Sequence, residues 1–172
     1  LREIEAVEHI CQQNGARQVK VAQSESERAR LWQARRSVSP ALARLAPNKL
    51  GEDITVPRSA IPEAVRGLKA ISVKYGLPIV IFGHAGDGNL HPNILFDQRD
   101  LEQRAKASQM AAEEFALSLK LGGTLSGEHG VGALKRPYIE QALGPLSLEI
   151  QKKIKAALDP LNILNPGKIF PD

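Results

Sequence analysis

The stretch PIVIFGHAGDGNLHPNILF, residues 78–96, decides the fold. Residues 78–84 are apolar and rich in β-branched side chains, residues 90–96 alternate in polarity, and the connection between them is rich in glycine. Two such runs joined by a short glycine-containing loop are typical of a β-hairpin. Side chains two residues apart share a face of a strand, so His91 and Asn93 are expected on one face. The residues expected on the opposite, core-facing side are Leu90, Ile94 and Phe96.

Helical periodicity extends the pattern on both sides of the hairpin. Apolar residues recur at helical spacing in residues 61–75 and 101–119, and Gly76 and Gly122 follow these stretches, as glycines do at the ends of many helices. Residues 50–56 are expected to form another strand. This order predicts an α+β fold, in which an antiparallel sheet is covered by helices on one face as a ferredoxin-like sandwich.

The two ends of the chain show further local signals. Residues 17–23 alternate in polarity and predict a short strand. Ser24 and Glu27 match a capping box that opens a helix, which Pro40 must end or kink. A last helix over residues 146–158 predicts a C-terminal helical extension.

The composition excludes several classes of protein. The 23 basic residues are interspersed with 19 acidic ones, and aromatic residues make up only 4% of the chain, whereas nucleic-acid-binding proteins gather basic side chains and aromatic platforms. No nucleic-acid partner is therefore expected. The single cysteine, Cys11, rules out a disulfide framework and a cysteine-based zinc site, and a reducing compartment is expected. The sequence has no signal-peptide pattern and no apolar run of the roughly 18 residues that span a bilayer.

Three of the four histidines lie in two glycine-rich segments, and the first segment is the tip of the hairpin. His84 would end one strand and His91 would begin the other, with six residues between them, so the two imidazoles could converge. Gly86 and Gly88 permit tight or left-handed turns at this tip. The plain alternative is a hairpin whose polar tip happens to contain histidine.

The second segment is GEHGVG, residues 127–132. Neighbouring side chains of a strand point apart, so Glu128 could face a metal ion while His129 faces a substrate. Two imidazoles and one carboxylate are a ligand set for a catalytic divalent metal with positions open to substrate. The alternative is a solvated loop pair.

A third candidate group lies on the helix opened by the capping box. Trp32, Arg35 and Ser39 fall on one side of that helix. The planar guanidinium of an arginine suits a carboxylate, because it donates two parallel hydrogen bonds. The alternative is an ordinary solvated helix face.

The two histidine segments, GHAGDGNLH (residues 83–91) and GEHGVG, resemble the signature segments of the FAD-linked oxidase C-terminal domain. That domain belongs to the vanillyl-alcohol-oxidase-type flavoproteins, in the branch with D-lactate dehydrogenase, D-2-hydroxyglutarate dehydrogenase and the glycolate oxidase D subunit. The ending LDP (158–160) and ILNPGK (163–168) is similar to the usual ending of the family. The likeness covers nearly the whole chain.

The resemblance implies roles for individual residues. In metal-dependent members the positions that match His84, His91 and Glu128 hold a divalent ion, usually zinc. The position that matches His129 is the base beside the substrate. The substrate-binding positions match Arg35, Ser39, Lys49 and Asn93. The cofactor-binding positions match Asn165 and Lys168.

The resemblance also implies a domain division and partners. Residues 1–121 would form a substrate-binding cap domain, and residues 122–172 would carry the Glu-His motif and pack toward an FAD-binding domain expected to precede this chain. The expected partners are that domain, a small 2-hydroxy acid, and an electron-acceptor protein or iron–sulfur subunit, and a homodimer is compatible with the family. The expected location is cytoplasmic, peripheral to the inner membrane through partner subunits.

The implied activity is that of an FAD-dependent 2-hydroxyacid dehydrogenase or oxidase, acting on lactate, glycolate or 2-hydroxyglutarate, and this chain alone is expected to be inactive. Arg35 would grip the substrate carboxylate, His129 would take the proton of the 2-hydroxyl held by the metal, and hydride would pass to the flavin. Two alternatives stay open: a zinc hydrolase with the same ligands, and a freestanding metal- or acid-binding module from a degenerate oxidase.

Overall fold

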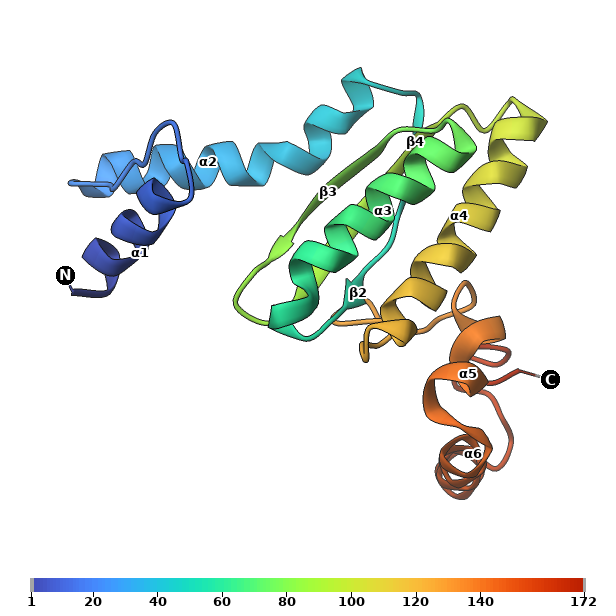
Figure 1. The fold of residues 1–172 in the computed structure, drawn as a ribbon. Helices are drawn as coiled ribbons and strands as arrows, with labels where there is room; N and C mark the ends of the chain where they lie inside the picture. The colour runs from blue at the N-terminus through green and yellow to red at the C-terminus, as the bar shows by residue number, and fades with distance from the viewer. Residues whose placement is uncertain (1, 172) are drawn as a thin grey trace. The chain divides into compact units, whose positions relative to one another are not determined.

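The computed structural model describes residues 2–171 (Figure 1). The chain forms two compact units, Leu1–Leu42 and Ala43–Asp172. No helix within the described residues is long and apolar enough to cross a bilayer.

The first unit is built from two helices, α1 (Arg2–Gln13) and α2 (Glu25–Ala41). Ser24 caps α2, because its side chain accepts a hydrogen bond from the Glu27 N–H (3.2 Å). The predicted N-terminal cap is confirmed. Pro40 lies in the last turn, and α2 ends one residue later, as expected for a residue that cannot donate to the helix ladder.

Residues 17–23 join these helices without forming a strand, so the strand predicted there is wrong. Val19 and Val21 alternate as in a strand, but a strand needs a neighbouring edge to pair its N–H and C=O groups. The described part of this unit offers only helices. The Gln23 N–H donates instead to the Glu27 carboxylate (2.7 Å) at the start of α2.

The second unit is built on an antiparallel sheet. Its strands are β1 (Asn48–Gly51), β2 (Ile54–Thr55), β3 (Ile79–His84) and β4 (Asn89–Phe96). β4 is central, with β1 and β2 along one edge and β3 along the other. The predicted hairpin and the predicted strand near residues 50–56 are both confirmed.

β1 and β2 act as one interrupted strand. The register of β1 against β4 continues unchanged into β2, so the step between them inserts no extra residue. The Glu52 N–H donates to the Pro92 carbonyl across this step (2.9 Å). Asp53 therefore lies opposite His91 in the sheet.

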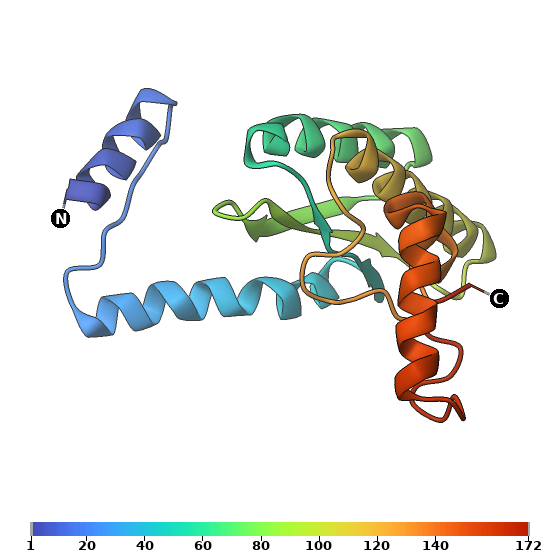
Figure 2. The same cartoon turned by 90° about the horizontal axis from the view of Figure 1, so that it is seen from below.

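Two helices, α3 (Ile61–Tyr75) and α4 (Leu101–Lys120), cover one face of the sheet (Figures 1 and 2). α3 ends at Gly76 with φ +69, a left-handed conformation that glycine adopts without steric cost. Fully buried apolar side chains fill the layer between sheet and helices; they include Ile54, Leu68, Ile94, Met110 and Phe115. The predicted α+β fold, with a sheet covered on one face, is confirmed.

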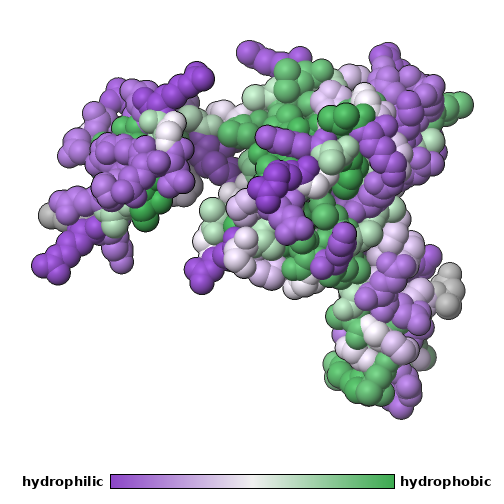
Figure 3. Space-filling view, in the orientation of Figure 1, coloured by the Kyte–Doolittle hydropathy of each residue, from purple (hydrophilic) through white to green (hydrophobic). Residues whose placement is uncertain are grey.

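The C-terminal part is a helical extension, as predicted. It contains η3 (Arg136–Tyr138), α5 (Ile139–Leu143) and α6 (Pro145–Leu158); two further 3-10 turns, η1 (Leu42–Arg44) and η2 (Arg58–Ala60), lie earlier in the chain. The five-residue α5 was not predicted, because so short a helix carries little periodic signal. Apolar surface gathers over α6 (Figure 3), where the exposed side chains include Leu146, Ile150, Ile154 and Leu158.

The functional boundary predicted between residues 121 and 122 stays a prediction. Compactness divides the chain elsewhere, between Leu42 and Ala43. Residues beyond 121 pack within the second unit: the Tyr138 ring, for example, lies 5.0 Å from the Phe115 ring of α4.

Candidate metal centre

The face of the sheet turned away from α3 and α4 carries most of the residues singled out in the sequence. Side chains alternate along β4, and Ile94 enters the core, so His91 and Asn93 point to the other face. His84 of β3 pairs with Asn89, two positions before His91, and shares that face. We call this side of the sheet the histidine face.

The hairpin tip and the segment after α4 meet on the histidine face. One ligand atom from each of His84, His91 and Glu128 lies within 4.8 Å of the others. The rings of His84 and His91 stand edge to face with centroids 5.4 Å apart, and those of His91 and His129 are stacked at 5.3 Å. The two glycine-rich segments of the sequence thus form one cluster.

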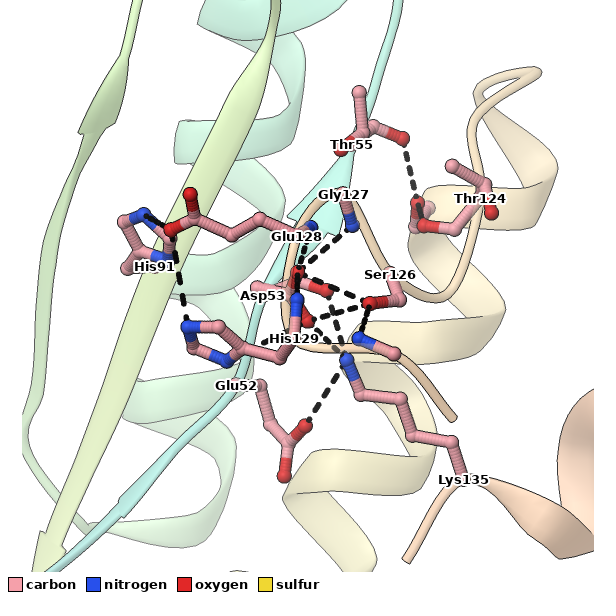
Figure 4. A network of polar contacts seen from close by, with 12 residues as sticks. Glu52, Asp53, Thr55, His91, Thr124, Ser126, Gly127, Glu128, His129 and Lys135 are labelled. Carbon is pink, nitrogen blue, oxygen red and sulfur yellow. Dashed lines mark hydrogen bonds and ion pairs between the residues drawn. The ribbon is translucent and has the colours of Figure 1, made fainter. Parts of the chain in front are cut away.

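Glu128 contacts both neighbouring imidazoles (Figure 4). Its Oε1 lies 3.1 Å from Nε2 of His91 and 3.8 Å from Nε2 of His129. The side chains of Glu128 and His129 are 53% and 51% exposed, whereas that of His91 is 8% exposed. One side of the cluster is therefore open to solvent and the other is buried.

The donor set suits a divalent metal ion. Zinc binds imidazole nitrogen and carboxylate oxygen at about 2.0–2.2 Å, so two donors on one tetrahedral ion lie roughly 3.4 Å apart. The observed spacing fits such an ion after small rotations of the side chains. Burial lowers the pKa of His91 despite the opposing charge of Glu128, which favours the neutral imidazole that binds metal ions.

Asp53 holds the loop that carries Glu128 and His129 (Figure 4). Its Oδ2 accepts hydrogen bonds from the backbone N–H groups of Gly127 (2.8 Å), Glu128 (2.6 Å) and His129 (2.9 Å). Burial alone would raise the pKa of Asp53. The hydrogen bonds from Lys135 and from the loop outweigh burial and lower this pKa to about 2, so the group is a carboxylate.

Sequence reasoning missed Asp53 and Lys135. Lys135 is 3% exposed; its ammonium donates to the Asp53 carboxylate and lies 3.6 Å from the Glu52 carboxylate. The alternation of the predicted strand could have indicated Asp53, because Ile54 faces the core and its neighbour must face the other way. Nothing near Lys135 in the sequence separates it from an ordinary solvated lysine.

Position 127 requires glycine, because the loop passes close to the side chains of Asn89 and Thr55 at this point. Thr55 and Thr124 form an antiparallel bridge, in which the Thr124 N–H donates to the Thr55 carbonyl (2.8 Å), so the loop lies against β2. A Cβ on Gly127 would overlap side-chain atoms of Asn89 and Thr55. The absence of a side chain at this position lets the loop reach the histidine face.

Asn93 and Lys49 also lie on the histidine face. Asn93 is 3% exposed, and its amide nitrogen donates to the His91 carbonyl (2.8 Å). Lys49 pairs with Leu95, which places it on the same face but farther from the histidines, and it is exposed.

The other predicted residues lie outside this sheet. Arg35 and Ser39 are one turn apart on α2, in the first unit. Asn165 and Lys168 lie in the tail after α6, where both are exposed and the Lys168 N–H donates to the Asn165 carbonyl (3.4 Å). Their functional roles stay predictions.

A domain of this kind also occurs in a solved oxidase. The structure of 4-ethylphenol oxidase from Gulosibacter chungangensis, in complex with isoeugenol, matches with a TM-score of 0.59 at 20% identity, and the match covers 88% of this chain and 32% of that one. The chain therefore has the fold of a domain found in that oxidase.

Comparison with related sequences identifies the family of the chain. It is 48% identical over 169 residues to the glycolate oxidase subunit GlcD of Bacillus subtilis, a match that covers 98% of this chain and 36% of the relative. It is 34% identical over 170 residues to the probable mitochondrial D-lactate dehydrogenase of Danio rerio, which covers 98% and 34%. The sequence profile of the FAD linked oxidases, C-terminal domain, matches residues 1–169, and the chain belongs to this family. The resemblance inferred from the histidine segments is confirmed, and the chain spans about a third of the length of these relatives.

Proposed function

We propose that this chain is the substrate- and metal-binding part of an FAD-dependent dehydrogenase or oxidase of small 2-hydroxy acids. The observation that carries the proposal is the convergence of His84, His91 and Glu128 beside the stacked ring of His129. Glycolate and D-lactate, named in the relatives, are both 2-hydroxy acids, which supports this substrate class.

His84, His91 and Glu128 would hold the metal ion, with zinc as the expected metal. Two imidazoles and one carboxylate leave positions open on a tetrahedral or five-coordinate ion. When bound, such an ion would polarise the 2-hydroxyl of the substrate and lower its pKa. The exposed side of the cluster, at Glu128 and His129, is where a substrate could enter.

His129 would act as the base. Its ring is stacked on His91 at 5.3 Å and its Nε2 lies 3.8 Å from Glu128, so a hydroxyl bound at the cluster would lie within reach of this imidazole. His129 would accept the proton of the 2-hydroxyl. A flavin bound by the separate domain would supply the acceptor for the hydride from C2, and the product would be a 2-oxo acid.

Four side chains would hold the rest of the substrate. Arg35 is the proposed clamp for the carboxylate, since its guanidinium can donate two parallel hydrogen bonds, and Ser39 would add a hydroxyl one turn later on α2. Asn93 uses its amide nitrogen for the His91 carbonyl, so its amide oxygen stays available as an acceptor. Lys49 would contribute a positive charge farther along the histidine face.

A separate FAD-binding domain would present the flavin to this site. Residues 1–121 would form the substrate-binding cap, and residues 122–172 would pack toward that domain, with Asn165 and Lys168 near the cofactor. The exposed apolar side chains over α6 support such packing. A further electron-acceptor or iron–sulfur subunit is part of the proposal, because one relative is named as a subunit.

Metal analysis of histidine variants tests the proposal. In the complete flavoenzyme, His84→Ala should lose the metal and the 2-hydroxyacid-dependent bleaching of the flavin together. His9→Ala is the matched control, because His9 is an exposed histidine of α1 and should keep both. Stoichiometric metal in His84→Ala would refute the ligand assignment, and a metal-loaded enzyme whose flavin no 2-hydroxy acid bleaches would refute the activity.

A further inference from the structure

A buried carboxylate lies beneath the loop that carries Glu128 and His129, and the proposed chemistry gives it no task. We propose that Asp53 is the positioning residue of the metal centre: it fixes the Ser126–Gly130 loop so that Glu128 and His129 face His91. This inference rests on the proposed function, since it concerns the same centre.

Three successive backbone N–H groups of the loop point at one oxygen of Asp53. Oδ2 accepts from Gly127, Glu128 and His129 at 2.6–2.9 Å. Such a concave arrangement of N–H groups is a typical anion-binding nest. The proposed ligand Glu128 and the proposed base His129 therefore each donate one backbone hydrogen bond to the same oxygen of Asp53.

The rest of the loop closes around the same carboxylate. The Ser126 hydroxyl lies 3.1 Å from both oxygens of Asp53 and accepts from the Gly130 N–H (2.8 Å). Lys135, after the loop, donates to the Asp53 carboxylate and to the Asp53 carbonyl (3.0 Å). Asp53 thus contacts residues before, within and after the Glu128–His129 pair.

The sheet register links this anchor to the metal ligands. Asp53 lies opposite His91, because the register of β1 continues into β2. Of these two facing strand residues, His91 is therefore a proposed metal ligand, and Asp53 anchors a second proposed ligand, Glu128. The Nδ1 of His129 also lies 3.6 Å from Oδ1 of Asp53, which directs the other ring nitrogen toward Glu128.

Only a charged group fits this position. Asp53 is fully buried, and a buried carboxylate is stable only when donors surround it. An asparagine has one acceptor oxygen, and its NH₂ group would face N–H and ammonium donors. Asp53→Asn should therefore release the loop while it leaves the volume of the side chain nearly unchanged.

Binding of Co²⁺ to the complete flavoenzyme tests the inference. After removal of the native metal, Asp53→Asn should bind Co²⁺ about 10- to 100-fold more weakly, the usual effect of losing a group that orients a metal ligand. The visible spectrum of bound Co²⁺ should also change, because it reports the coordination geometry. Glu52→Gln is the matched control: Glu52 is the adjacent buried carboxylate and contacts Lys135, but it faces the core, so Co²⁺ affinity should stay within about twofold.

The outcomes separate this inference from the proposed function. If the unaltered enzyme does not bind one Co²⁺ per chain, the metal centre itself is refuted and the positioning role with it. If it binds Co²⁺ and Asp53→Asn binds equally tightly with the same spectrum, only the positioning role is refuted. Should Asp53→Asn fail to fold by circular dichroism, Ser126→Ala decides the question. Loss of this hydroxyl should weaken Co²⁺ binding about 3- to 10-fold, as for one hydrogen bond, and an unchanged affinity and spectrum would overturn the inference.

Discussion

The buried carboxyl group of Glu114 leads to a prediction about how the free energy of unfolding depends on pH. It lies on α4 with no exposed surface, and neither carboxylate oxygen has a hydrogen-bond partner among the described residues. Burial, with a smaller contribution from the charge of Glu52, raises the pKa of Glu114 from 4.5 to about 8. The folded chain therefore keeps this proton at neutral pH, whereas the unfolded chain releases it.

The sign and the size of the effect follow from linkage. Between pH 4.5 and about 8 the folded state binds more protons at Glu114 than the unfolded state, so the free energy of unfolding falls as the pH rises through this range and levels off above it. At 1.36 kcal/mol per pKa unit, the full shift corresponds to about 5 kcal/mol. Of this, about 4 kcal/mol falls between pH 5 and pH 9.

Glu114→Gln should remove this dependence, because the amide resembles the protonated acid and does not ionise. We expect the variant to gain about 4 kcal/mol relative to the unaltered 172-residue chain between pH 5 and pH 9. Urea denaturation followed by far-UV circular dichroism measures the difference at each pH. Glu52 titrates in both proteins, and its smaller effect on Glu114 is already part of the Glu114 shift.

Glu113→Gln is the control for this experiment. Glu113 is the preceding residue, but hydrogen bonds from Lys74 and Tyr75 lower its pKa. It is ionised in both states above pH 5, so its removal should change the free energy of unfolding by the same amount at pH 5 and pH 9. If the difference in free energy of unfolding between Glu114→Gln and the unaltered chain is also the same at pH 5 and pH 9, Glu114 is ionised in the folded chain and the reasoning fails.

Three shorter tests address the site and the core. In the complete flavoenzyme, His129→Ala should lower turnover about 10²- to 10⁴-fold, the range for a positioned base; near-normal steady-state rates would remove that role. Gly127→Ala should reduce metal content and activity together, because its Cβ would overlap Asn89 and Thr55; full metal content by elemental analysis would contradict the close approach. Ile94→Ala should lower the free energy of unfolding by about 2–5 kcal/mol in urea denaturation, since Ile94 is fully buried in the core; a loss under about 1 kcal/mol would argue against this packing.

The parts of the fold that follow from local periodicity could be predicted from the sequence. The hairpin joins neighbouring segments, so alternation and the glycine-rich tip were enough to place His84, His91 and Asn93 on one face. Helices α3 and α4 follow from apolar spacing and terminal glycines. The strand expected over residues 17–23 failed for the opposite reason, because its alternation says nothing about whether an edge is available.

The polar network around the site could not be predicted in the same way. Lys135 meets Asp53 across a long stretch of sequence, and lysine is rarely buried unless it is paired, so no local pattern indicates it. The residue types of Glu128 and the hairpin histidines suggested a metal-ligand set, and the family resemblance assigned these three residues to it. The spacing of those residues alone left a solvated loop pair open as the alternative.

The adjacent residues Glu52 and Asp53 lie on opposite faces of the sheet and have pKa values shifted in opposite directions. Neighbouring strand residues point to opposite faces; burial raises the pKa of Glu52 to about 7, whereas the donors around Asp53 overcome burial and lower its pKa to about 2. Lys135 donates to the Asp53 carboxylate, its ammonium lies 3.6 Å from the Glu52 carboxylate, and it acts to lower the pKa of both groups. The Lys135 ammonium therefore stabilises the charged form of Asp53, which holds the loop, whereas burial keeps the pKa values of Glu52 and Glu114 raised in the core. Changes of pH near neutrality should consequently alter the packing of α4 on the sheet before they alter the anchor of the metal centre.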